Sequence, residues 1–270
     1  MPPDDERAPE QGNFQWRPDA DAPAGIEPDR PAATPRKPPL AARTGALFEV
    51  LVCSDFPTQL LVAQALAFAG LTPFTSDHRY SAAFVITLSL ADAVLLVGIV
   101  LWFLYVHGER PRAVLFGRRA IRREALLGVF LVPLVFLIAA TVLALVQQFA
   151  PSLHNVARNP LEALIRSPTD AVLMALVAVV SGGVREEVQR AFILHRFEQY
   201  LGGAPIGLVL FSLVFGLGHV IQGWDAVVTT ATLGVFWGVV YLARRSIAAP
   251  MVSHAGFDLA EIIRYTLYGP

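Results

Sequence analysis

The chain has 270 residues, of which 54% are hydrophobic and 16% are charged, and its formal net charge at pH 7 is −1. A soluble domain averages about 25% charged residues, so this composition, with a mean hydropathy of +0.52, indicates a membrane protein. The near-neutral charge gives no reason to expect a nucleic-acid partner. The only cysteine, Cys53, excludes an internal disulfide.

The N-terminal segment differs from the rest of the chain. Residues 1–45 contain ten of the twenty prolines and almost no aliphatic residues. Such a segment cannot bury enough apolar surface to offset the entropy lost on ordering, and it has no apolar stretch of the kind found in signal peptides. We therefore divide the chain into a disordered cytoplasmic tail, residues 1–45, and a transmembrane helical domain, residues 46–270.

From residue 46 onward, apolar stretches recur at lengths close to the ~20 residues that cross a bilayer as a helix. Their pattern predicts an all-α polytopic bundle of about seven transmembrane helices. The segments are 47–70, 81–106, 126–149, 171–194, 206–222, 226–243 and 247–267.

Basic residues gather in alternate connections between these segments. The stretches "RKPPLAAR", "HGERPRAVLFGRRAIRREA", "HRF" and "ARRS" hold the arginine excess, whereas "TPFTSDHRY" and "QGWDA" are poor in it. The positive-inside rule then places the N-terminus in the cytoplasm, and we expect the protein in a bacterial plasma membrane.

Polar residues interrupt the apolar pattern at three places in the C-terminal half. They are "REEVQR" (Arg185 to Arg190), His219 in "FGLGH", and His254 with Asp258 in "HAGFD". Charged side chains at the hydrocarbon level are costly, so these groups are expected to converge inside the bundle around water or each other. Asp92, His195 and Arg196 are expected to have ordinary structural roles, with Arg196 reaching towards the interface.

Two glutamates and two histidines in a wet pocket suit hydrolysis. A carboxylate can take a proton from water, and an imidazole can orient that water or stabilise the oxyanion on an attacked carbonyl. The sequence has no GxSxG motif, which argues against a serine nucleophile.

The three motifs, in this order on separate predicted helices, resemble the CaaX protease and bacteriocin-processing family of intramembrane proteases, which includes the type II CaaX prenyl endopeptidases. The resemblance covers about residues 170–265. It implies that Glu186 is the general base, that His219 assists it, and that His254 and Asp258 form the pair that faces the oxyanion. It also implies that Glu187 and Arg190 support the site.

Two departures from the family pattern bear on these roles. The family has three residues between its second glutamate and its arginine, whereas only Val188 and Gln189 separate Glu187 from Arg190. Aligning Arg190 with the family arginine instead makes Glu186 the second glutamate and puts Arg185 in the first place, so the base is either Glu186 or Glu187. Asp258 stands where the family has asparagine. An ionised aspartate would oppose an oxyanion, so Asp258 must be protonated, paired with a cation or bound to something else.

The last option leads to a metal alternative. Glu186, His219 and His254 with a water would make a plausible catalytic zinc site, although no HExxH motif is present. The reaction therefore needs either no cofactor or zinc.

The function that these residues predict is an integral membrane endopeptidase whose substrate is a membrane-associated peptide or protein. The alternative is a non-proteolytic transporter or immunity-type scaffold that uses the Glu/His cluster to relay protons or hold a partner. The lipid bilayer is the other expected partner, and the oligomeric state does not follow from the sequence.

Overall fold

The computed structural model of the chain describes residues 38–269. Most of the tail predicted over residues 1–45 lies outside the described residues. Helix α1 begins at Leu40, directly after Pro39, so the boundary predicted at residue 45 is too late. Leucine, alanine and arginine are all good helix formers, and they start the helix before the apolar stretch begins.

Within residues 38–269 the chain forms helices and no β-strand, apart from a single bridge between Phe74 and Tyr80. The predicted all-α class is confirmed. The helices are α1 (Leu40–Val52), α2 (Phe56–Phe68), α3 (Ala82–Val106), α4 (Pro111–Leu115), α5 (Ile121–Phe149), α6 (Pro168–Val177), η3 (Ala178–Arg185), α7 (Glu186–Tyr200), α8 (Ala204–Leu217), α9 (Trp224–Arg244) and α10 (Ala248–Tyr268). Short 3-10 turns are η1 (Pro151–Leu153), η2 (Glu162–Leu164) and η4 (Val220–Gln222).

Each of the seven predicted segments falls on a helix or on joined helices. By length and composition, α3, α5 and α9 can cross a membrane, and α1 with α2 adds a fourth candidate that is bent by 44°. The fourth predicted segment is one continuous run of α6, η3 and α7. The separate helices of this run are each too short to qualify as a span by length and composition. Helix α10 is long enough but carries several charged residues.

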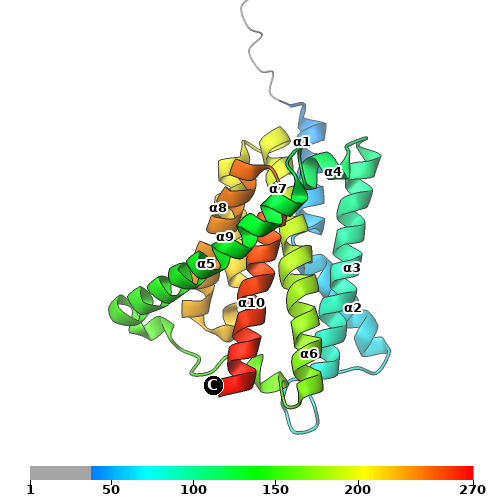
Figure 1. The fold of residues 1–270 in the computed structure, drawn as a ribbon. Coiled ribbons are helices and arrows are strands. Elements are labelled where there is room, and N and C mark those ends of the chain that lie inside the picture. Colours follow the sequence, from blue (N-terminus) through cyan, green and yellow to red (C-terminus); the bar gives the residue numbers. More distant parts are fainter. Residues whose placement is uncertain (1–37, 270) are drawn as a thin grey trace, which may run out of the picture. The chain divides into compact units, whose positions relative to one another are not determined.

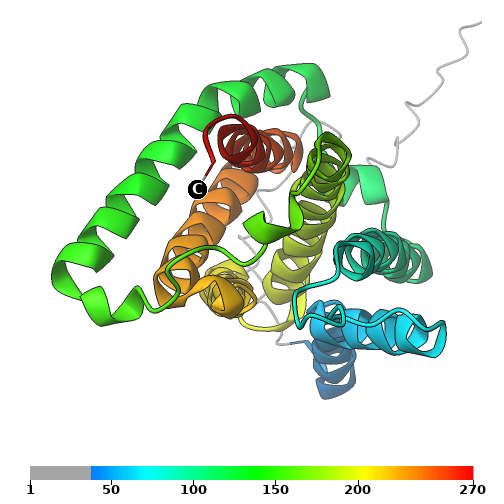
Figure 2. The same ribbon diagram turned by 90° about the horizontal axis from the view of Figure 1, so that it is seen from below.

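The helices of residues 38–269 are arranged around the run α6–η3–α7 (Figures 1 and 2). Helices α1 to α3 lie on one side of it, and α8, α9 and α10 lie on the other. Helix α5 slants across the outside, where it packs mainly on α10 and also on α9. This arrangement brings the three motif-bearing segments together in the centre.

Local sequence explains where several helices begin. The hydroxyl of Ser81 accepts a hydrogen bond from the Phe84 amide at the start of α3, and Ser167 caps α6 in the same way through the Asp170 amide. Pro168 follows Ser167 as the first residue of α6, a position that suits its fixed φ and its missing N–H. In the core, the large side chains Leu104 of α3, Phe192 of α7 and Trp237 of α9 are almost fully buried.

The outer face of α5 is strongly apolar. Leu126, Phe130, Leu137 and Phe149 are all more than half exposed on it. Exposed apolar patches of this extent are unusual on soluble monomers, and they fit a helix that faces lipid.

Candidate active site

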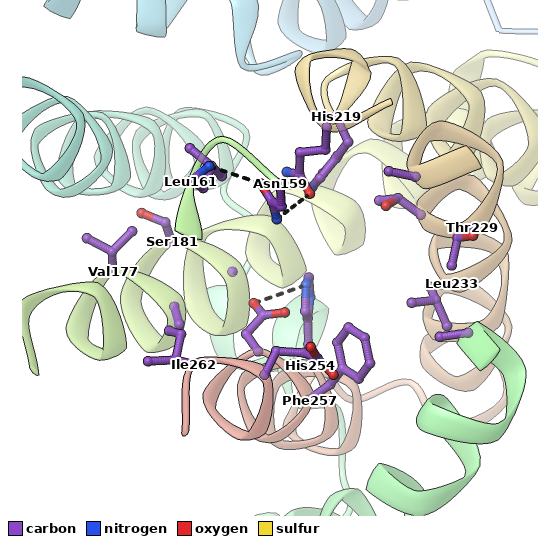
Figure 3. Close-up of a pocket in the computed structure, with 18 of the residues that line it drawn as sticks. Asn159, Leu161, Val177, Ser181, His219, Thr229, Leu233, His254, Phe257 and Ile262 are labelled. Atoms are coloured by element: carbon purple, nitrogen blue, oxygen red, sulfur yellow. Dashed lines mark hydrogen bonds and ion pairs between the residues drawn. The ribbon is translucent and has the colours of Figure 1, made fainter. Parts of the chain in front are cut away.

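A cavity of about 560 Å³ lies among α5, the α6–η3–α7 run, η4, α9 and α10. Four of the six predicted site residues line it, namely Glu186, His219, His254 and Asp258. His219 and His254 approach the pocket from different elements (Figure 3). The structure therefore brings together the motifs from the fourth, fifth and seventh predicted segments, as the sequence analysis expected.

The two glutamates are preceded by an unusual turn of backbone. Residues Ala178–Arg185 form a π-helix, and this rare geometry is frequent at functional sites. Gly182 lies against the Asp258 carboxylate, and a Cβ at Gly183 would come within 2.8 Å of the Cβ of Ala255. The glycines thus let α10 approach the turn closely enough for its polar residues to reach Glu186.

Glu186 is the glutamate that faces the cavity. Its Oε1 accepts a hydrogen bond of 2.8 Å from Nη2 of Arg185. The Nη1 group of Arg185 contacts Asp92 at 2.8 Å and also pairs with Asp55. One guanidinium therefore ties the Glu186 carboxylate to α3 and to the break between α1 and α2.

Glu187 points away from the cavity and is 1% exposed. Its Oε1 accepts hydrogen bonds from Arg190 and, at 2.9 Å, from Nδ1 of His254. The Arg190 guanidinium is fully buried above the rings of Phe215, at 4.9 Å, and Trp237, at 5.6 Å. Glu187 and Arg190 thus form a buried ion pair behind the site rather than part of its lining.

His254 is held by Trp237 and Glu187. Its ring stacks on Trp237 with centroids 3.8 Å apart, and the indole N–H donates to Ser253 at 3.1 Å. The Glu187 carboxylate accepts a hydrogen bond from Nδ1 of His254. The other ring nitrogen, Nε2, is therefore directed towards the cavity carboxylates. Nε2 lies 3.7 Å from Oε2 of Glu186 and 3.7 Å from Oδ2 of Asp258.

His219 follows the C-terminal end of α8 and is half-buried. Its Nδ1 lies 3.0 Å from the backbone oxygen of Phe215. A carbonyl can only accept, so Nδ1 carries a proton and Nε2 is an acceptor when the imidazole is neutral. The ring is therefore fixed in the tautomer that can receive a hydrogen bond from water.

The two alternatives that the sequence left open for the base now differ in geometry. Glu186 lines the cavity with 12% of its side chain exposed, whereas Glu187 is enclosed by Arg190 and His254. Arg185, which takes the first glutamate's place in the alternative alignment, holds Glu186 by a hydrogen bond. This geometry favours Glu186 as the carboxylate that can meet water.

The zinc alternative named Glu186, His219 and His254, which all line the cavity. Among residues 38–269, no group of three or more histidine, cysteine, aspartate or glutamate side chains is placed to hold a metal ion. A zinc ion at these residues therefore stays a prediction for experiment.

Asp92 is fully buried and pairs with Arg185 of a neighbouring helix, which fits the structural role expected for it. A charge in the middle of an apolar stretch was the available signal for it. Asn159 and Gln222, which line the cavity and join through Nδ2 and Oε1 at 3.3 Å, lie in connections without any such signal.

The expectation for Arg196 was wrong. Its side chain is 1% exposed and donates to Glu49 at 2.5 Å and to Glu109 at 2.7 Å. Partners from α1 and from the connection after α3 are close enough to make burial of the charge favourable, so it does not reach out to the interface.

The cavity inside this bundle of apolar helices is lined by carboxylates, among them Glu186 and Asp258, and by two imidazoles. Residues 168–260 match the family model described as Rce1-like, type II CAAX prenyl endopeptidase Rce1-like. The matched range contains all three motifs. Searches of the curated proteins and of the solved structures gave no match for this chain.

This match agrees with the resemblance of the three motifs to the CaaX protease and bacteriocin-processing family, and it covers residues 168–260 of the chain. Together with the apolar helices, the match indicates an integral membrane protein in which residues 168–260 are similar to a protease family.

Proposed function

We propose that this protein is an intramembrane endopeptidase in which Glu186 activates water for attack on a peptide bond. The observation that carries the proposal is the convergence of Glu186, His219, His254 and Asp258 on one cavity. Intramembrane ionisable residues are functional by default, because their burial in lipid is costly.

The reaction uses four groups. Glu186 accepts a proton from water while Nε2 of His219 accepts the water's other hydrogen bond, and the resulting hydroxide attacks the carbonyl carbon. Nε2 of His254, when protonated, donates to the oxyanion that forms. The C–N bond then breaks, and the proton held by Glu186 passes to the leaving amine.

The surrounding charges support these assignments. Three carboxylates lie around the His254 ring, with Glu187 at 2.9 Å and Glu186 and Asp258 at 3.7 Å. Such neighbours stabilise an imidazolium. Asp258, which replaces the family asparagine, is then paired with a cation and does not oppose the oxyanion by itself.

Arg185 is proposed as a positioning residue. Its Nη2 holds Oε1 of Glu186, which leaves Oε2 facing the His254 side of the cavity. The arginine itself is held by two aspartates, Asp55 and Asp92, from other helices. This network fixes the direction of the base.

The test uses the full-length protein in lipid nanodiscs with a pool of single-span peptides that differ in the residues next to the membrane. Cleavage is read by mass spectrometry. Glu186→Gln keeps the size and hydrogen-bonding shape of the side chain but cannot take a proton, so cleavage should fall by about 10²–10⁴-fold. The matched control is Glu109→Gln, a change of the same kind outside the cavity.

Equal cleavage by the Glu186→Gln variant and the parent would reject the assignment of the base. A parallel reaction with a chelator examines zinc, since full activity in its presence rejects metal dependence. The transporter alternative predicts proton-coupled uptake in the same membranes, lost in Glu186→Gln, without any peptide cleavage.

A further inference from the structure

The two ends of the bundle differ in basic residues. The end formed by the start of α1 and by the α3–α5, α7–α8 and α9–α10 connections is here named the basic end. The stretch "ERPRAVLFGRRAIRRE" between α3 and the first turn of α5 alone carries six arginines. The opposite end is here named the open end. Its connections carry Arg79 between α2 and α3 and Arg158 and Arg166 between α5 and α6, and the last turns of α10 carry Arg264.

Contacts join the basic connections to one another. Nε of Arg119 donates to the Arg244 carbonyl at 3.0 Å, and Arg245 forms a paired contact with Glu198 at 2.5 and 2.6 Å. These residues come from three separate connections, so the arginine-rich segments share one end of the bundle (Figure 1). The positive-inside rule places that end in the cytoplasm.

The cavity extends towards the open end. Asn159, Glu162, Gln222 and Tyr265 line it there. A second cavity of about 580 Å³ shares Asn159, Glu162 and Gln222 with the first and continues past Arg264. The two hollows therefore lead from Glu186 and His254 to the segment 150–167 and the end of α10.

Packed side chains close the cavity on the other side. Leu115, Leu194, Tyr241 and Ile247 are buried between the site and the basic connections. The Tyr241 hydroxyl donates to the Val114 carbonyl at 3.0 Å, and the Ile247 amide donates to the Leu115 carbonyl at 2.8 Å. Among residues 38–269, these side chains and hydrogen bonds fill the space between the cavity and the basic connections.

The basic end is placed in the cytoplasm, and the cavity opens towards the opposite end. We therefore infer that the site takes its substrate from the non-cytoplasmic face of the membrane. Its substrate class is a membrane-anchored peptide whose cleavable segment lies at or just outside that face, not a peptide end presented in the cytoplasm. The inference rests on the proposed peptidase function for its substrate class, but the orientation of the cavity stands independently of it.

The mouth of the cavity suits a peptide backbone. Asn159 and Gln222 bring neutral amides to it, and their mutual hydrogen bond of 3.3 Å is at the long end of the usual range. The nearby pair of Arg264 and Glu162 is also loose, at 3.4 Å. Such groups can exchange these contacts for hydrogen bonds to an extended chain.

Orientation is tested by labelling single cysteines with a membrane-impermeant maleimide. The only native cysteine, Cys53, is buried and is replaced in a Cys53→Ala background. Ala163→Cys places a thiol on an exposed position of the open end, and Arg118→Cys places one on an exposed position of the basic end. A membrane-permeant maleimide should label both variants in every preparation, which shows that both thiols are accessible.

In right-side-out spheroplasts, Ala163→Cys should be labelled and Arg118→Cys protected, and inside-out vesicles should give the reverse. The opposite pattern, or labelling of both positions from one side, overturns the inference.

The substrate class is tested with two single-span reporters that carry the same cleavable segment, chosen from the cleaved pool, outside or inside the cell. Cleavage of the outward reporter alone supports the inference. Cleavage of the inward reporter alone overturns it and leaves the peptidase intact. If neither reporter is cleaved although the labelling pattern is as expected, the proposed substrate class is overturned, whereas cleavage of the peptide pool still supports the peptidase function.

Discussion

Two clusters of acids, histidines and arginines occupy different levels of this bundle. The cavity cluster joins Glu186, His254 and Asp258, whereas the cluster at the basic end joins Glu109, His195 and Arg196. Both contain the residue types of a hydrolytic site, and both connect segments far apart in the chain. Residue type alone therefore does not distinguish a site from a structural network.

The two clusters differ in their access to the cavity and in how fully their carboxylate oxygens are hydrogen-bonded. At the basic end, both carboxylate oxygens of Glu109 accept hydrogen bonds, and so do both oxygens of Glu49. In the cavity, Nε2 of His254 has carboxylates at 3.7 Å, beyond hydrogen-bonding distance. That spacing, next to a hollow, leaves room for water or a peptide carbonyl, whereas the saturated cluster fastens helix ends together.

The largest expected difference between the clusters is in activity. His219→Asn should lower peptide cleavage by about 10²-fold or more, because the water loses its acceptor. His195→Asn should leave cleavage within about twofold of the parent, since His195 lies outside the cavity. Initial rates in nanodiscs measure both, and equal losses in the two variants would contradict the distinction between the clusters.

The next largest effect concerns stability. Glu187→Ala leaves the buried Arg190 without its carboxylate and should destabilise the protein by about 3–5 kcal/mol, as for other broken buried pairs. Replacing both members, Glu187→Leu with Arg190→Met, should recover much of that loss because no charge remains buried. Unfolding in detergent monitored by circular dichroism measures both variants. A double variant that is no more stable than Glu187→Ala would show that the pair is not the source of the loss.

A smaller effect is expected from the positioning arginine. Arg185→Lys cannot hold Glu186 and Asp92 with the same fork of donors, so kcat should fall by about tenfold while KM changes little. The control is Arg244→Lys at the basic end, where a similar fork contacts Glu124 at 2.7 and 2.9 Å. A rise in KM alone would indicate that Arg185 contacts the substrate instead.

The smallest effect is a pH dependence at the basic end. Burial raises the pKa of Glu109, but hydrogen bonds from Gln199, Arg196 and His195 outweigh it, and the pKa lies below its ordinary value of 4.5. A carboxylate with a lowered folded-state pKa stabilises the fold above its unfolded pKa, and this contribution is lost as the pH falls through the folded value.

The Tm difference between the parent and Glu109→Gln should therefore be largest near pH 7, where it corresponds to no more than about 1 kcal/mol. It should shrink as the pH falls below about 4.5. Thermal unfolding in detergent over this pH range measures it, and peptide cleavage should not follow the same curve. A difference that grows towards low pH would mean that Glu109 is not stabilised as a carboxylate.

The positions of the helices could be predicted because lipid demands that every backbone group be satisfied within a segment, and apolar stretches of sufficient length reveal such segments. The motif residues could be found because charge is rare at that depth. The start of α1 at Leu40 could not be predicted, since it depends on local backbone geometry that hydropathy does not record.

The sequence by itself determined the class of fold, the residues of the three motifs and the need for them to meet inside the bundle. Only the tertiary structure decided that Glu186 faces the cavity while Glu187 pairs with Arg190, and that Arg185 is held by Asp92. The physical reason is that a side chain's direction depends on the phase of its helix, here set by the π-helix before Glu186, and on partners that lie far away in the chain.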